Sequence, residues 1–443
     1  MGATAQLARF IAESRYEDLP PKVVQGAKIA TMDGVGNMLA GSRQPLAGKV
    51  ARYVQAMGGS PTNTVVGHSF KTNVLGAAFA NGVFGHCLDF EIQGNPPTHG
   101  TSSCLPAAMA LGESAHSSGR RLIEAYVVGW EVQGRIRAAT ASVTKRAFHP
   151  PGLVGPLGGA ASAAKALGLD AHHVRLALGI AASRTGGLTA NTGTMVKSTH
   201  PGNAARMGVE SAVLAQMDFL SDEDILEAPN GYGEAMFTGP VNWDKVTAGL
   251  GDTYLLSDPG FDIKRFPAQL YMQRPIEAVL NLKQKHGLRA DQISLLTVAS
   301  PQESRSRPRP RTGLDGKFSV EYCSAAAMLD GHVNIDTFTD ERRFAPDMQA
   351  FLPRVRAGAS DGPGATVTAQ LRDGRTLSEV CVDFRGSIAN PMSREERLAK
   401  FRDCAHRALT PPQTDTLVSL LEHLEDLADV SELTRVLGQQ AET

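Results

Sequence analysis

The sequence lacks a large net charge of either sign and lacks long apolar runs. Its 443 residues hold 44 lysines and arginines against 45 aspartates and glutamates, which leaves a formal net charge of −1. A chain with so little net charge has no overall field to attract nucleic acid or an anionic membrane surface. No apolar run reaches the roughly 18 residues of a membrane-spanning helix. We therefore expect a globular protein with neither a nucleic-acid partner nor a membrane partner.

Cysteine is scarce, and the few cysteines are scattered. There are five of them, an odd number, and no two form a C-x-x-C pair. They are Cys87, Cys104, Cys323, Cys381 and Cys404. This usage is typical of reduced thiols and not of a disulfide framework. Residues 1–20 have helical periodicity and contain acidic side chains, unlike a targeting peptide. We expect a cytoplasmic protein.

Glycine and alanine are abundant, in segments with the pattern of helices. Segments such as "LPAAMALGESA" and "GPLGGAASAAKALGL" are apolar nearly all round, and the breaks between such segments fall at Gly, Pro or Asn. Helices that are apolar on every side lie inside a protein, and small side chains let their backbones approach closely. We predict that residues 1–259 form most of a large helical domain.

The pattern changes in the next part of the chain. Residues 293–301 are rich in β-branched side chains, and residues 365–384 alternate on both sides of an Asp373-Gly374 turn, as in a β-hairpin. Between them, residues 317–331 have the composition of a helix. We predict a smaller inserted α/β domain over residues 260–392.

Residues 393–443 are expected to return to the helical domain. Ser393 precedes a helical pattern, and Glu396 completes a capping box. The predicted fold class is therefore mainly α with an α+β part. A large all-helical domain is built from both ends of the chain, and a smaller α/β domain is inserted between them.

Several common catalytic motifs are absent from the sequence. It contains no H-E-x-x-H and no histidine and cysteine cluster with zinc-ligand spacing. The glycine-rich stretches "GVGNMLAG" and "GLVGPLGG" fit neither the dinucleotide-binding nor the P-loop spacing. Nothing in the sequence requires a metal or a nucleotide.

Four polar islands interrupt the apolar helical sequence. Their polar groups, in chain order, are Asp89 and Glu91 with Thr98 and His99, then His149, then Lys197 with His200, and then Tyr322. Most have a simple structural explanation: a histidine before proline is often a turn residue, and a tyrosine is often a core aromatic. Lys197 is the least easily explained in this way, because long cations seldom lie in runs of Gly, Thr and Ala. Burial there would lower its pKa towards that of a useful base.

These islands and the segments around them resemble the MmgE/PrpD family. The resemblance runs through "DGVGNMLAG", "ANGVFGHCLDF", "PTHGTSSCLPAAMALGE", "FHPPGLVGPLGG" and "KSTHPGNAARMG" to "FDIKRFPAQLYMQRPIEA" and "FSVEYCSAAAMLDG". It implies a helical domain with a smaller α/β lid, a homodimer, no cofactor, and a site between the domains for a small di- or tricarboxylate. The family includes 2-methylcitrate dehydratase, cis-aconitate decarboxylase and iminodisuccinate epimerase.

The resemblance also assigns site residues, position by position. The catalytic residues that it implies are Asp89, His99, His149, Lys197 and Tyr322. The substrate-binding residues that we expect are Gln93, Thr98, His200, Gln273 and Arg274. Further arginines near the motifs could bind carboxylates in bidentate fashion; they are Arg135, Arg184, Arg206 and Arg265.

The sequence departs from the family's pattern in two segments. Gln93 stands where the decarboxylase-like pattern has a threonine. Gln273 stands where the family has a histidine, and Gln269 stands where some relatives have one. Glutamine can hydrogen-bond a carboxylate but cannot exchange a proton. The lid therefore lacks one acid/base group that the family implies.

The family's activities all change bonds at a carbon next to a carboxylate. Negative charge that develops there must be stabilised by nearby cations or donors. We interpret Lys197 and His149 as general base and acid, with His99 and Tyr322 as donors. The sequence favours a lyase that dehydrates or decarboxylates a citrate- or aconitate-like acid. The alternative is an epimerase of an iminodisuccinate-like diacid, which needs two proton-transfer groups but no leaving-group acid. A non-catalytic binding protein is a third interpretation.

Overall fold

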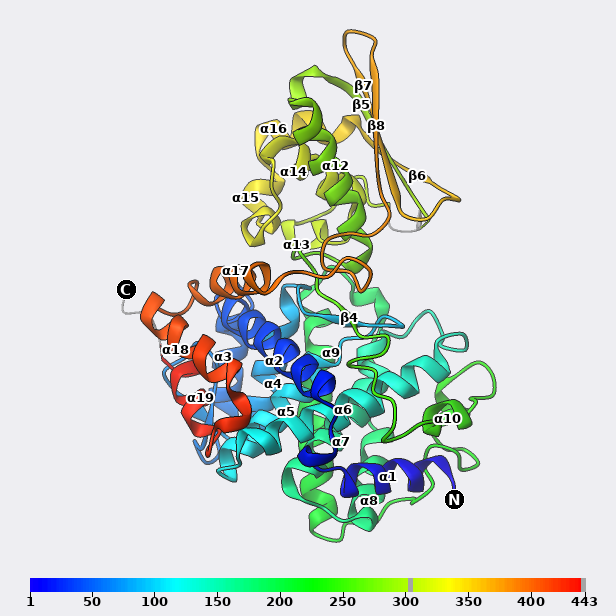
Figure 1. The fold of residues 1–443 in the computed structure, drawn as a ribbon, viewed down its shortest axis with the longest axis vertical. Coiled ribbons are helices and arrows are strands. Elements are labelled where there is room, and N and C mark those ends of the chain that lie inside the picture. Colours follow the sequence, from blue (N-terminus) through cyan, green and yellow to red (C-terminus); the bar gives the residue numbers. More distant parts are fainter. Residues whose placement is uncertain (302–305, 440–443) are drawn as a thin grey trace.

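The computed structural model describes residues 1–301 and 306–439, and it has a helical body with a smaller domain above it (Figure 1). The helices of the first part of the body are α1 (Ala3–Glu13), α2 (Pro21–Gly41), α3 (Ala47–Met57), α4 (Val74–Cys87), α5 (Thr101–Ser114), α6 (Gly119–Thr140), α7 (Pro150–Leu167), α8 (Ala171–Ala182), α9 (Met195–Gln216), α10 (Tyr232–Met236) and α11 (Asp244–Thr247). In the described part of the chain, no helix combines the length and the apolar character that crossing a bilayer demands.

The last helices of the chain pack on the same body (Figure 1). They are α17 (Arg394–Ala405), α18 (Pro411–Glu422) and α19 (Ser431–Leu437), and α17 lies against α2. Ser393 caps α17 and forms the predicted capping box with Glu396. The expected return of the chain to the helical domain is confirmed.

The inner helices of the body cross at glycines. Gly208 of α9 lies against Gly159 of α7, where an added Cβ would come within 2.3 Å of the Gly159 carbonyl carbon. At the crossing of α4 and α9, Gly82 lies against Gly202 in the same way. Gly82 lies less than two helical turns before the end of α4, and Gly202 lies about two turns after the start of α9. Close backbone contact there brings the end of α4 and the start of α9 together.

Two short strand pairs connect loops of the body. β1 (Asn63–Thr64) pairs with β2 (Lys71–Thr72), and β3 (Gln93–Gly94) pairs antiparallel with β4 (Phe261–Asp262). β4 is the strand from which the chain enters the upper domain. The β3–β4 pair therefore ties the first polar island to the start of the lid.

The lid combines a mixed sheet with helices. Its elements are α12 (Gln273–His286), β5 (Ile293–Ser300), α13 (Gly313–Gly316), α14 (Val320–Asp330), α15 (Asp340–Arg343), α16 (Pro346–Phe351), β6 (Val355–Ala359), β7 (Ala365–Leu371) and β8 (Thr376–Cys381). The strand order is β6-β5-β7-β8, with β5 parallel to β6 and the other neighbours antiparallel. α12 and α14 pack against this sheet (Figure 1).

The predicted hairpin of the lid is present, with one difference in its second strand. Gly374 adopts a φ of 90° in the turn between β7 and β8. Val380 is 53% exposed, Val382 is also exposed, and Cys381 between them is buried. Ala365, whose side chain faces the core, pairs directly with Cys381. Since side chains alternate along a strand, this register turns the two valines towards solvent.

The body and the lid have separate hydrophobic cores. The first core runs from Leu7 to Ile263 and resumes at Met392, with Ile335 added from the lid, whereas the second lies between Phe266 and Phe384. The predicted fold class, mainly α with an α+β part, is confirmed. We retain the domain boundaries at residues 260 and 393 as a proposal, and the change of core supports them.

Candidate active site

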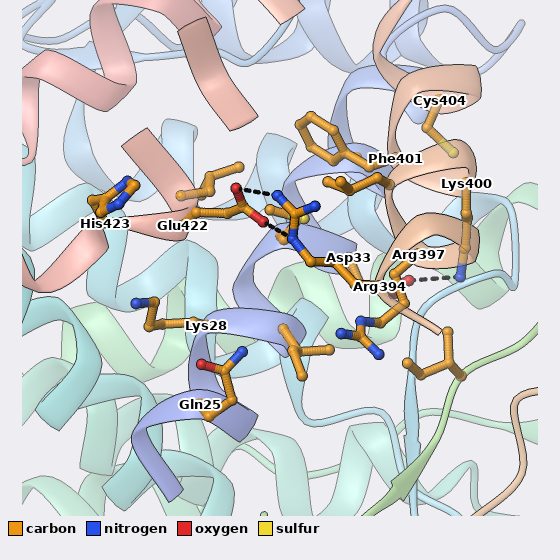
Figure 2. A pocket seen from close by; sticks show the side chains of 16 residues that line it. Gln25, Lys28, Asp33, Arg394, Arg397, Lys400, Phe401, Cys404, Glu422 and His423 are labelled. Atoms are coloured by element: carbon orange, nitrogen blue, oxygen red, sulfur yellow. Dashed lines mark hydrogen bonds and ion pairs between the residues drawn. The ribbon is translucent and has the colours of Figure 1, made fainter. Parts of the chain in front are cut away.

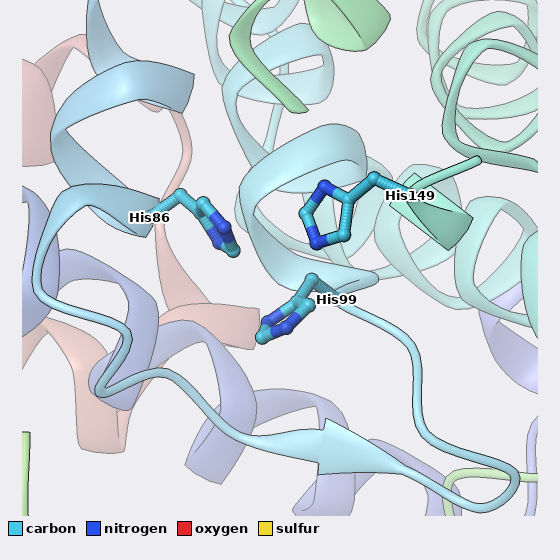
Figure 3. Close-up of side chains that lie close together, drawn as sticks. All are labelled: His86, His99 and His149. Atoms are coloured by element: carbon cyan, nitrogen blue, oxygen red, sulfur yellow. The ribbon is translucent and has the colours of Figure 1, made fainter. Parts of the chain in front are cut away.

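Three histidines from different segments of the body point towards one another (Figure 3). His86 lies at the end of α4, His99 in the loop before α5, and His149 directly before α7. The ring centroids are 4.5 Å apart for His86 and His99, 5.8 Å for His86 and His149, and 6.2 Å for His99 and His149. His200 of α9 extends the group, because its Nδ1 lies 3.0 Å from that of His149.

Asp89 links the histidines to two buried lysines. Lys197 Nζ donates to Asp89 Oδ2 at 2.7 Å and contacts His86 Nε2 at 2.9 Å. Lys264, which follows β4, donates to Asp89 Oδ1 at 2.5 Å and to the Asp89 carbonyl oxygen at 3.0 Å. Lys197 belongs to the body and Lys264 to the chain that enters the lid. One carboxylate therefore joins cations from both sides of the domain boundary.

The backbone at Asp89 has a left-handed conformation. Its φ is 52°, and its N–H donates to the carbonyl oxygen of His86 just beyond the end of α4. Aspartate adopts this region more readily than most residues that carry a side chain. The tight turn aims the carboxylate back at the start of α9, where Lys197 lies.

Glu91 holds two of the histidines. Its carboxylate lies 2.6 Å from His86 Nδ1 and 3.0 Å from His99 Nδ1, and it accepts hydrogen bonds from the backbone and hydroxyl of Ser102. Because the Lys197 ammonium donates to His86 Nε2, that nitrogen is the acceptor and Nδ1 carries the proton donated to Glu91. The contacts thus fix the tautomer of His86.

A third lysine approaches from the lid. Lys317 is buried and donates to the carbonyl oxygen of Leu88 at 2.8 Å. Burial lowers its pKa to about 8. The ring of its neighbour Phe318 lies 5.1 Å from Lys197 Nζ. Lys197, Lys264 and Lys317 therefore surround the turn that carries Asp89.

Burial keeps the histidines of the cluster neutral. Burial, with the nearby Lys197, lowers the pKa of His86 to about 3 and that of His200 to about 4. The pKa of His99 and that of His149 are also well below the usual range, again mainly through burial. At neutral pH these rings can donate or accept hydrogen bonds but carry no charge.

The charged groups of the site have a positive excess. Burial raises the pKa of Asp89, but Lys197 and Lys264 outweigh that effect and hold it well below its usual value. Burial lowers the pKa of Lys197, and the Asp89 carboxylate offsets part of this shift. Three lysines face the carboxylates of Asp89 and Glu91. A further anionic group from a ligand would balance this excess.

The buried neutral histidines predict a loss of stability in acid. In the unfolded chain the imidazole of His200 binds a proton below about pH 6.5, whereas in the folded protein it binds one only near pH 4. The unfolded state then binds more protons, so the free energy of unfolding falls as the pH falls between these values, by about 1.4 kcal/mol per pH unit for each such histidine. We expect His200→Gln to reduce the slope by about that amount, measured by urea denaturation between about pH 7 and about pH 4.5. The exposed His286→Gln variant is the control, and an equal reduction there would contradict the prediction.

The donor set of the site suits an anion better than a metal ion. One nitrogen from each of His86, His99 and His149 lies within 4.8 Å of the others, which is a possible metal-ligand spacing. His86, however, uses both nitrogens in contacts to Glu91 and Lys197. Three ammonium groups nearby would also repel a cation.

Two more predicted residues lie beside His99. Gln93 is buried, and its Nε2 is 3.4 Å from His99 Nε2. Thr98 is also buried and accepts a hydrogen bond from Gln133 Nε2 at 2.9 Å. The structure therefore brings together seven of the predicted site residues: Asp89, Gln93, Thr98, His99, His149, Lys197 and His200.

Gln273 lies in the lid and contacts the backbone instead of the cluster. Its Oε1 accepts from the N–H groups of Arg265 and Phe266, and its Nε2 donates to the carbonyl oxygens of Phe266 and Ala268. Its amide braces the turn that follows Lys264. As placed here, it has no hydrogen-bonding group left for a substrate.

Loss of these bonds predicts a stability effect for Gln273→Leu. Four backbone contacts would be removed from a fully buried site, so we expect the free energy of unfolding to fall by about 3 kcal/mol. The KM of the folded fraction should stay near the wild-type value. Urea denaturation and steady-state kinetics on the same samples would measure both. A large rise in KM at unchanged stability would restore the substrate-binding role.

The structure does not bring Tyr322 and Arg274 to the cluster. Tyr322 is fully buried in the lid core, and its hydroxyl donates to the carbonyl oxygen of Thr337 at 2.5 Å. Arg274 Nε donates to the carbonyl oxygen of Val382 at 2.6 Å, also within the lid. Their roles at the site stay predictions.

The arginines expected to bind carboxylates are also engaged elsewhere in the described structure. Arg135 is buried and bonded to Glu131 and to backbone carbonyls. Arg184 pairs with Glu210, and Arg265 lies 3.7 Å from Glu277. Arg206 lies over the ring of Phe79. The cations gathered at the site are lysines.

Sequence reasoning missed three residues of the site and noted a fourth without assigning it a role. The missed residues are His86, Lys264 and Lys317, and the fourth is Glu91. The signal was available: each missed residue is a polar or charged side chain beside apolar residues, in "GVFGHC", "FDIKRF" and "GKFSV". The same criterion, a charged side chain among small or apolar residues, singles out Lys197 in the sequence.

Comparison with known proteins gives one family along nearly the whole chain. The MmgE/PrpD N-terminal domain matches residues 5–244, and the MmgE/PrpD C-terminal domain matches residues 266–426. A cis-aconitate decarboxylase from Mus musculus is 31% identical, over 98% of this chain and 93% of its own length. The corresponding enzyme from Homo sapiens is 30% identical over 98% and 94%, and one from Aspergillus terreus is 27% identical over 99% and 96%.

Proposed function

The chain belongs to the MmgE/PrpD family, and from that premise we propose that it is a cofactor-independent lyase that decarboxylates cis-aconitate or a closely similar tricarboxylate. The observation that carries the proposal is the buried group of three lysines around Asp89, bordered by neutral histidines. The activity of the related cis-aconitate decarboxylases supports the choice of decarboxylation over dehydration.

The lysines suit a substrate with several carboxylates. Lys197 comes from the body, whereas Lys264 and Lys317 belong to the lid segments that close over it. A lysine binds a carboxylate as a compact point charge, without the fixed fork of an arginine. A tricarboxylate held between body and lid would balance the positive excess of the site.

The reaction moves two electron pairs along an allylic system. In cis-aconitate, one carboxylate is attached to a CH2 group beside the double bond. When CO2 leaves, the electrons of the broken C–C bond form a terminal double bond. The electrons of the former double bond move to the far carbon, which carries another carboxylate. A proton added there gives methylidenesuccinate, and cations beside that carboxylate stabilise the developing charge.

Lys197 is the proposed donor of that proton. An ammonium group has three N–H donors, and the contacts of Lys197 to Asp89 and His86 use two of them. Burial lowers its pKa, which makes proton release easier, while Asp89 favours the charged form before reaction. His149 is the proposed acid/base group that exchanges protons with Lys197. Each such group contributes about 10²–10⁴-fold to the rate.

The glutamine at position 273 is compatible with this proposal. Its hydrogen bonds to the backbone support the turn that follows Lys264. In this proposal the groups that transfer protons are Lys197 and His149, and both belong to the body. The histidine that the family implies in the lid would then not be needed for proton transfer in this chain.

Epimerisation of an iminodisuccinate-like diacid is the second candidate function. It needs two proton-transfer groups on opposite faces of one carbon. His99 and His149, whose ring centroids are 6.2 Å apart, are two candidate groups for this role. A non-catalytic binding protein remains the third candidate.

Proton NMR in D2O with cis-aconitate, 2-methylcitrate, citrate and iminodisuccinate tests the proposal. New signals of a terminal CH2 group, with release of CO2 and deuterium in the product, are expected with cis-aconitate alone. Deuterium entering iminodisuccinate without a new product, together with a change in optical rotation, would favour the epimerase. Formation of water-elimination products would favour a dehydratase. Binding without turnover of any acid would favour the binding protein.

We also propose that the protein is a cytoplasmic homodimer. Met217, Phe219 and Leu220, at the end of α9, are each more than half exposed, and contiguous exposed apolar residues favour a protein contact. All five cysteines are free, as a reducing compartment would keep them. Light scattering should give twice the 47.0 kDa of one chain, and Phe219→Glu with Leu220→Glu should give the monomer.

A further inference from the structure

A cavity lies in the body between α2, α17 and α18 (Figure 2). Its volume is about 330 Å³, within the roughly 300–1,000 Å³ of small-molecule sites. Its apolar lining comes from the facing sides of these helices and from the chain that enters the lid; it consists of Ile29, Met32, Ile263, Leu398, Phe401 and Leu421. We call it the α2–α17 cavity. No residue of the histidine and lysine cluster is among the described residues that line it.

Most cations of this cavity are paired with a carboxylate. Lys28 pairs with Glu425 at 2.6 Å, Arg394 with Glu422 at 2.8 Å, and Lys400 with Asp33 at 2.6 Å. Figure 2 shows the last two pairs as dashed lines. These pairs leave little net charge along most of the wall.

Arg397 is the exception. Its guanidinium donates to the carbonyl oxygen of Met392 at 2.7 Å, and no carboxylate in the described part of the chain forms an ion pair with it. The side chain is half-buried, and burial lowers its pKa. An arginine in this position is still charged. Glu395, Glu396 and Glu422 act on it only from beyond ion-pair distance. The cavity therefore combines an apolar lining with one positive charge that has no direct ion-pair partner among the described residues.

We infer that the α2–α17 cavity binds a monocarboxylate with an apolar body, of the medium-chain fatty acid class. The carboxylate would accept charge-assisted hydrogen bonds from Arg397. The alkyl chain would lie against Ile29, Leu398 and Phe401, where its transfer from water is favourable. A tricarboxylate fits less well, because the other cations of the wall already pair with carboxylates, so its further charges would be buried without a free counter-charge.

Isothermal titration calorimetry with octanoate tests this inference on the full-length protein. We expect one octanoate bound per chain. Octylamine, which has the same alkyl chain but a positive charge, should not bind. Arg397→Gln should weaken octanoate binding at least about tenfold, and Ile29→Trp, which fills the cavity, should abolish it. The matched control is Arg402→Gln, an arginine on the same helix that pairs with the exposed Asp415 and lies outside the lining; it should keep the wild-type affinity.

Several results would overturn the inference. The first is a failure of octanoate to bind the wild-type protein. The second is binding of octylamine with the same affinity as octanoate, and the third is an equal octanoate affinity in Arg397→Gln and wild type. Circular dichroism melting curves would verify that the variants fold. The inference does not depend on the proposed reaction. Arg397→Gln should keep wild-type turnover of the carboxylate substrate while losing octanoate binding, so a failure of either proposal is visible separately.

Discussion

Replacement of Lys197 by methionine should lower turnover of the carboxylate substrate by about 10³-fold or more. Methionine preserves most of the length of the side chain but removes the ammonium group that contacts Asp89 and His86. The variant loses both the proposed proton donor and one of the three cations that stabilise developing charge. Losses of this size are usual when such groups are removed. Product formation in the NMR assay, expressed per folded protein, is the measurement.

Lys165→Met is the matched control for this experiment. Lys165 is also buried, burial lowers its pKa to about 8, and its ammonium donates to the carbonyl oxygens of Ala12 and Ser14, away from the cluster. Its replacement should reduce stability and leave the turnover of the folded fraction unchanged. If Lys197→Met kept more than about a tenth of wild-type turnover, the donor role would be refuted.

Replacement of Asp89 by asparagine should destabilise the fold by about 3–5 kcal/mol and abolish activity. Asparagine has nearly the same shape but no charge, so the buried ammonium groups of Lys197 and Lys264 would lose their shared counter-charge. Uncompensated buried charges are among the most destabilising single changes. Urea denaturation near neutral pH measures the change in the free energy of unfolding.

The double variant Asp89→Asn with Lys264→Met makes this prediction specific. Removal of one of the two uncompensated ammonium groups should recover part of the lost stability, so the effects of the two changes on the free energy of unfolding should be clearly non-additive. Activity should stay absent in the double variant. Additive losses, or an Asp89→Asn variant as stable as wild type, would mean that the carboxylate does not compensate the two lysines.

The fold could be predicted from local patterns to a large extent. The Asp373-Gly374 turn, the Ser393 capping box and the apolar helices each depend on neighbouring residues, so the sequence indicates them directly. The face of β8 that points inward could not be predicted in this way. It depends on the pairing of Ala365 with Cys381, which is a tertiary property.

The candidate site was predictable where a motif placed a polar residue at the end of a body helix. Lys197 and His149 are of this kind, and both lie in the cluster. The lid residues were harder to place. Gln273 and Tyr322 look like site residues in the sequence, but their polar groups contact backbone atoms of the lid. Those contacts depend on how the lid packs, which no local pattern specifies.

The construction of the body from both ends of the chain has a consequence for folding during synthesis. Lys400 of α17 donates to the carbonyl oxygen of Phe90 and pairs with Asp33, which in turn accepts from the N–H of Ile92. The segment between Asp89 and Gln93 is therefore held by a helix whose Lys400 is synthesised 310 residues after Phe90. Until α17 is made, the face of α2 that packs against α17 stays uncovered. The lid, in contrast, can fold around its own core. Exposed apolar surface of this kind is what chaperones bind, so the nascent chain should depend on them most in the interval before α17 is made.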